Sequence, residues 1–123
     1  MYNEKLMKQW AFEEHEASTL AQSYGFDKVR EITVTVVDAF GKSFVGKSWT
    51  FKPESKAFFR EWCDCGECYG PRSGLDYSSE IREIVMARQT EATINVRCGG
   101  FGDIGLHYSC DNYITLKVHV DYL

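Results

Sequence analysis

Hydrophobic positions near the N-terminus recur at helical spacing. Between residues 4 and 24 the apolar side chains are three, four or seven positions apart, and the acidic residues fall largely elsewhere. The apolar positions are Leu6, Met7, Trp10, Ala17, Leu20, Ala21 and Tyr24. This spacing is typical of an amphipathic helix. Gly25 follows the last of them, as glycine often does after a helix C-terminus, so we predict a helix over residues 4–24.

Three later stretches show the period of two that is typical of half-buried strands. The first is 29–38, which turn residues at 38–42 connect to a return strand over 43–51, and together they predict a β-hairpin. The others are 90–98 and 113–122, which we expect to pair as a second hairpin. In the last stretch Ile114, Leu116, Val118 and Val120 are expected to point inward.

Two shorter helices are predicted between the hairpins. Pro53 can occupy the first turn of a helix that continues over 54–62. Ser78 or Ser79 can cap a helix over 80–89 that buries Ile81, Ile84 and Val85. Glycine and proline predict loops at 68–75 and 99–105. The chain is thus expected to form a single α+β domain over 1–123, with an antiparallel sheet built from two β-hairpins and helices packed on one face.

Composition narrows the classes of function. The net charge of −4 and the scattered basic residues give no positive stripe, which disfavours nucleic-acid binding. No apolar run is long enough to span a bilayer, and the polar first nine residues do not resemble a signal peptide. A cytoplasmic, reducing setting is therefore expected. The five cysteines are an odd number, which does not suit a closed disulfide framework.

The cysteines are the most definite chemical feature of the sequence. Cys63, Cys65 and Cys68 lie within six residues, and Cys98 and Cys110 follow at a distance. Structural Zn²⁺ takes four soft ligands in a tetrahedron, usually as two close pairs. Zinc is the cofactor that this pattern favours.

The sequence allows more than one set of ligands. One arrangement uses Cys65 and Cys68 with Cys98 and Cys110, which would lie at the same end of the second hairpin, and Cys63 is then spare or replaces one of them. A tighter arrangement uses the first three cysteines with Cys98, and His107 is a further candidate. The alternatives to zinc are buried cysteines without metal, a disulfide or an iron–sulfur cluster. A redox motif at 65–68 is disfavoured because the pair follows a helix instead of starting one.

Two other motifs have simpler explanations. Residues 100–105 match G-x-G-x-x-G, but a dinucleotide fold needs a helix after the glycines, and a strand is expected here. A hairpin loop explains these glycines better. The acidic run around His15 could bind a metal from one helix face, although a solvated helix surface explains it more simply.

The loops around the cysteines supply the candidate partner surface. Tyr69, Arg72 and Tyr108 lie there, and tyrosine and arginine are favoured in protein–protein contacts. The sequence therefore predicts a small zinc-stabilised module that binds a protein or another ligand and carries no catalytic constellation. The alternatives are a small metalloenzyme, in which His107 or His15 completes an open site, and a nucleic-acid-binding zinc module.

Overall fold

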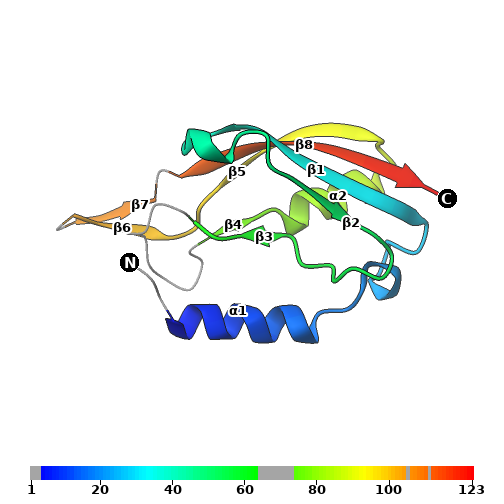
Figure 1. Ribbon diagram of the computed structural model, residues 1–123, viewed down its shortest axis with the longest axis horizontal. Coiled ribbons are helices and arrows are strands. Elements are labelled where there is room, and N and C mark those ends of the chain that lie inside the picture. Colours follow the sequence, from blue (N-terminus) through cyan, green and yellow to red (C-terminus); the bar gives the residue numbers. More distant parts are fainter. Residues whose placement is uncertain (1–3, 64–73, 105, 111) are drawn as a thin grey trace.

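A four-stranded antiparallel sheet forms the centre of the molecule. The computed structural model describes residues 4–63, 74–104, 106–110 and 112–123. The sheet contains β1 (Val29–Ala39), β2 (Ser48–Phe51), β5 (Glu91–Arg97) and β8 (Tyr113–Tyr122) in the order β2-β1-β8-β5. Helices α1 (Glu4–Glu16) and α2 (Ser78–Met86) both lie on the same side of it (Figure 1). The expected α+β class and antiparallel sheet are confirmed.

The core lies between this sheet and the layer beneath it. In the pairing of β1 with β8, Ile32 faces Val120, Val34 faces Val118 and Val36 faces Leu116, and all six side chains are buried. The next positions along these strands carry polar side chains such as Thr35, Lys117 and His119 on the opposite face. The alternation predicted from the sequence thus places one face of the sheet against the core. Helix α2 adds Ile81, Ile84 and Val85 to that core, as expected.

The first helix is shorter than the sequence predicts. Helix α1 ends at Glu16, a 3₁₀ turn η1 follows at Leu20–Gln22, and the side chain of Tyr24 is 95% exposed. The N–H groups of Leu20 and Ala21 donate to the carbonyls of Ser55 and Pro53, at 2.7 and 3.0 Å. Because these backbone groups bond to a distant segment, they cannot continue the helical ladder. No helix in the described part of the chain has the length and apolar character needed to cross a membrane.

The predicted helix over 54–62 is wrong. These residues run as an extended segment into a short strand, β3 (Arg60–Glu61), which pairs with β4 (Leu75–Asp76). Their backbone groups bond outside the segment: Ala57 N–H donates to the carbonyl of Ser18 at 2.9 Å, and Tyr77 N–H to that of Phe59 at 2.9 Å. Tertiary pairing has overridden the local helical pattern. This segment lies between α1 and the sheet (Figure 1).

The remaining differences concern strand boundaries. The return strand predicted over 43–51 is a 3₁₀ turn η2 (Lys42–Phe44) followed by the shorter β2. The loop predicted over 99–105 is instead largely a strand, β6 (Phe101–Ile104), which pairs with β7 (Leu106–Ser109). This small hairpin projects from the end of the molecule where β5 ends and β8 begins (Figure 1). Helix α2 begins at Ser78 and ends at Met86, slightly earlier than expected.

Candidate metal centre

Three of the five cysteines meet at the base of the β6–β7 hairpin. Cys63 follows β3 by two residues, Cys98 comes directly after β5, and Cys110 comes directly after β7. Their sulfur atoms all lie within 4.8 Å of one another, and the Sγ atoms of Cys63 and Cys110 are 3.6 Å apart. Three segments distant in sequence therefore converge on one thiol cluster, which we call the cysteine centre.

The spacing of the sulfurs suits a shared metal ion. Tetrahedral zinc with Zn–S bonds of about 2.3 Å holds its sulfurs about 3.8 Å apart. The separation of 3.6 Å between Cys63 and Cys110 is close to that value and too long for a disulfide between these two. Two thiolates about 4 Å apart near a protein surface repel by about 4 kcal/mol. Three ionised thiols could share this space only around a cation.

The strand register brings Cys98 and Cys110 together. Strands β5 and β8 pair with Val96 opposite Ile114, and the ladder continues with the N–H of Cys98 donating to the carbonyl of Asn112 at 3.0 Å. The N–H of Cys110 donates to the carbonyl of Gly100 at 2.8 Å. The two cysteines thus lie at the same end of the β5–β8 pair, as the sequence indicates. Each is only 6% exposed, whereas Cys63 is half-buried.

Hydrogen-bond donors point at the sulfurs. The N–H groups of Gly74 and Gly100 donate to Cys98 Sγ at 3.1 and 3.3 Å, and the side-chain amide of Asn112 donates to Cys63 Sγ at 3.2 Å. Hydrogen bonds to the charged form of an acid favour that form. Such donors around metal-bound sulfur also orient the ligands and tune the site. These contacts therefore favour thiolates at Cys63 and Cys98.

Gly74 is fixed in place by its close packing. Its φ of +124° lies where other residues are strained, and a Cβ there would lie 2.5 Å from Cη2 of Trp10. Asn112 is 3% exposed and joins Cys63 through its side chain to Cys98 through its carbonyl. The sequence interpretation missed both residues. Asn112 lies two positions after Cys110, where a residue that supports a ligand could lie. No spacing rule identifies such a residue from the sequence.

The other predicted site residues have different outcomes. Cys65, Cys68, Tyr69 and Arg72 lie outside the described residues, and their roles stay predictions. His107 and Tyr108 belong to β7, where they face Asp103 and Gly102 across the hairpin, but their side chains lie outside what the structure describes. His15 is an exposed residue of α1. Within the described residues, the cluster able to hold a metal consists of three cysteines and contains no histidine or carboxylate.

Comparison with known proteins adds no family to this description. The chain matches no protein-family model, and no curated protein or solved structure is significantly similar to it.

Proposed function

We propose that the chain is a small zinc-stabilised binding module. In this proposal the thiolates of Cys63, Cys98 and Cys110 hold Zn²⁺ together with a fourth protein ligand. The sequence offers Cys65 and Cys68 for that position, with His107 as a further candidate. The observation that carries the proposal is the convergence of three sulfurs within 4.8 Å, with three N–H donors directed at two of them. Bound zinc would offset part of the negative charge of the thiolates and connect the ends of β3, β5 and β7.

A structural role is favoured over a catalytic one by the ligand type. Structural zinc sites are closed and rich in cysteine, whereas catalytic sites keep a water position among histidines and carboxylates. The described part of the cluster is made of thiols alone, and two of the three are buried. This composition supports a clasp that holds the end of the sheet and the β6–β7 hairpin in one arrangement.

The test is the metal content of protein purified without added metal, together with thiol titration before and after chelation. We expect one equivalent of zinc that protects four thiols, and release of the metal on acidification, because thiolate ligands must be deprotonated to bind. Separate Cys65→Ser and Cys68→Ser variants then identify the fourth ligand, since only one of them should lower the stoichiometry. Metal-free protein with five freely titrating thiols would contradict the proposal.

The partner surface is proposed at the same end of the molecule. Tyr69, Arg72 and Tyr108 come from segments that flank the cysteine centre in sequence, and we propose that they contact a protein partner. Their alanine variants should retain zinc and lose the partner that the wild-type protein binds. Tyr24→Ala is the matched control, because Tyr24 is a fully exposed tyrosine outside these segments. Partner binding that survives all three alanine substitutions would remove this surface from the proposal.

A further inference from the structure

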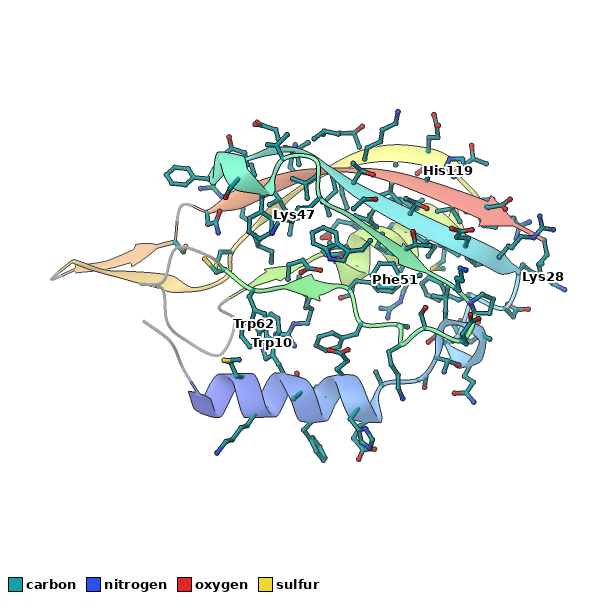
Figure 2. The ribbon with its side chains drawn as sticks, viewed as in Figure 1. Trp10, Lys28, Lys47, Phe51, Trp62 and His119 are labelled. Atoms are coloured by element: carbon teal, nitrogen blue, oxygen red, sulfur yellow. The ribbon has the colours of Figure 1, made fainter. Side chains whose placement is uncertain are left out.

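A cavity of about 530 Å³ lies between helix α1 and strands β2 and β3. Its aromatic walls come from all three elements and the segments beside β3: Trp10, Trp49, Phe51, Phe58 and Trp62. Figure 2 shows Trp10 and Trp62 side by side between α1 and β3, with Phe51 in the layer under the sheet. We call this site the aromatic cavity. The three tryptophans in its wall are all those of the chain.

Of the two stacked tryptophans in the wall, Trp10 is buried and Trp62 is exposed. Trp10 stacks on Trp62 with ring centroids 3.8 Å apart, and the guanidinium of Arg60 lies 4.0 Å from the Trp10 ring. Because both groups cover a face of Trp10, they occupy its two sides. Trp62 is 41% exposed, so part of its side chain can be reached by a ligand. A cation placed over such a face is attracted by the ring quadrupole.

The basic groups of the cavity already have partners. Arg60 Nη1 donates to Glu13 Oε2 at 2.9 Å, and its Nε lies 3.6 Å from Asp76 Oδ2. Lys56 Nζ donates to the carbonyls of His15 and Ala17 at 3.0 and 2.8 Å, close to the C-terminus of α1. These cations are therefore engaged in holding the fold. An anionic ligand would have to compete for them.

The acidic groups of the cavity, unlike its basic groups, have no such partners among the described residues. Glu14 and Glu61 both line it, and among the described residues neither carboxylate makes a hydrogen bond or an ion pair. Burial, and after it the negative charge of Glu14, raise the pKa of Glu61 to about 7, while the positive charge of Lys47 opposes the rise. Lys47 itself lies over the Phe44 ring, 4.7 Å from its centroid. Among the described residues, the cavity thus has two carboxyl groups that are not paired with a cation.

We propose that the aromatic cavity binds a methylated ammonium group, held by the exposed ring surface of Trp62 and by the carboxyl groups of Glu14 and Glu61. A methylated ammonium is weakly hydrated and donates few hydrogen bonds, so aromatic faces and nearby negative charge suit it. A primary ammonium needs three acceptors. The group can belong to a small molecule of the choline type or to a methylated lysine of a peptide. This site is separate from the cysteine centre and does not depend on the metal's identity.

The experiment is a fluorescence titration, because every tryptophan of the chain lies in the wall of the cavity. The probes are choline and its uncharged isostere 3,3-dimethylbutan-1-ol, followed by a trimethyllysine peptide and the same peptide with unmodified lysine. We expect saturable changes with the charged probes, and affinity for the isostere weaker by about 10- to 30-fold. A trimethyllysine peptide that binds tenfold more tightly than choline identifies a peptide ligand, whereas equal or weaker binding identifies a small molecule.

Variants of α1 separate this ligand chemistry from general stability. Glu14→Gln keeps an exposed polar side chain on the helix and should weaken the charged probe by about 3- to 10-fold without changing affinity for the isostere. Glu16→Gln is the matched control, since Glu16 is an exposed acidic residue of the same helix that does not line the cavity. No saturable signal with any charged probe would overturn the proposal. Equal affinity for choline and its isostere, or equal loss in both variants, would overturn it as well.

Discussion

The cysteine centre and the aromatic cavity adjoin one short stretch, residues 60–63, yet they are built in opposite ways. The centre is closed by the backbone: its cysteines follow strands, and their positions are set by ladder hydrogen bonds and glycine N–H donors. The cavity is closed by side chains that a helix, an edge strand and an extended segment bring together. A centre fixed by register should respond to change in an all-or-none way, and the cavity in a graded way.

Two direct links join the regions. Trp62, which stacks on Trp10 in the cavity, directly precedes Cys63 in the chain. The backbone N–H of Gly74 donates to Cys98 Sγ, and Gly74 lies so close to the Trp10 ring that a Cβ would not fit between them. Changes at these links should affect both regions, whereas changes elsewhere should affect only one. Substitutions can therefore test how separate the two regions are.

The largest effect is expected from Cys98→Ser. Cys98 is buried and accepts two backbone N–H bonds, so the substitution would remove a proposed zinc ligand and leave the two donors only a hydroxyl on a shorter bond as acceptor. Structural zinc contributes on the order of 10 kcal/mol in small domains, and we expect this variant to lose zinc and cooperative thermal unfolding. Val96→Ala, near the end of the strand that precedes Cys98, should lose about 2 kcal/mol of stability and keep one equivalent of zinc. A zinc-free Cys98→Ser protein with an unchanged melting temperature would show that the centre carries no stability.

A smaller loss of stability is expected from Gly74→Ala, because Gly74 contacts both the cysteine centre and the aromatic cavity. The new Cβ would lie 2.5 Å from Trp10, and the φ of +124° adds backbone strain. Together these should lower the free energy of unfolding by about 3 kcal/mol. They should also shift tryptophan emission and weaken zinc binding. Gly25→Ala is the control, because Gly25 has a φ of +89° and nothing within 4 Å of the added Cβ. Equal losses in the two variants, measured by urea unfolding, would exclude a packing role for Gly74.

Asn112→Ala tests the centre alone. Its buried amide donates to Cys63 Sγ, and supporting residues of this kind change metal affinity by about 10- to 100-fold. We expect weaker zinc binding in competition with a chelator and a stability loss of about 2 kcal/mol, with tryptophan emission unchanged. Asn95→Ala is the control, because the Asn95 side chain accepts a hydrogen bond from the Thr115 hydroxyl on the exposed face of the sheet. Equal zinc affinity in the two variants would mean that Asn112 does not support the ligand.

The sequence predicts most of the strands that position the cysteine centre. Alternation over 113–122 is clean because β8 lies in the middle of the sheet with one face on the core, and it coincides with the observed strand. The placement of Cys98 and Cys110 at one end follows from antiparallel pairing of two strands that the sequence already suggests. Cys63 joins them through β3, a two-residue strand whose local pattern also fits a helix. No local signal distinguishes the two there.

The cavity could not be predicted in this way. It depends on where α1 lies against the segment 55–62, and that docking is set by bonds such as those of Lys56 to the end of the helix. The sequence pattern assigns Trp10 to an apolar face and Trp62 to another helix, which gives no reason to expect them to stack. From its residue type, Glu14 is predicted to lie on a solvated helix surface. Its place in the wall of the cavity follows only from the tertiary structure.

The smallest effect is expected from Arg60→Lys, which tests the cavity alone. The planar guanidinium stacks on Trp10 while it contacts Glu13 on α1 and Asp76 on β4, and an ammonium cannot make all three contacts. We expect a loss of about 1 kcal/mol in the free energy of unfolding and altered tryptophan emission, with zinc stoichiometry unchanged. In the control Arg30→Lys, the exposed pair with Asp121 should contribute almost nothing. If Arg60→Lys also released zinc, the two regions would form one cooperative unit, because side-chain packing in the cavity would then be needed to hold Cys63 in place.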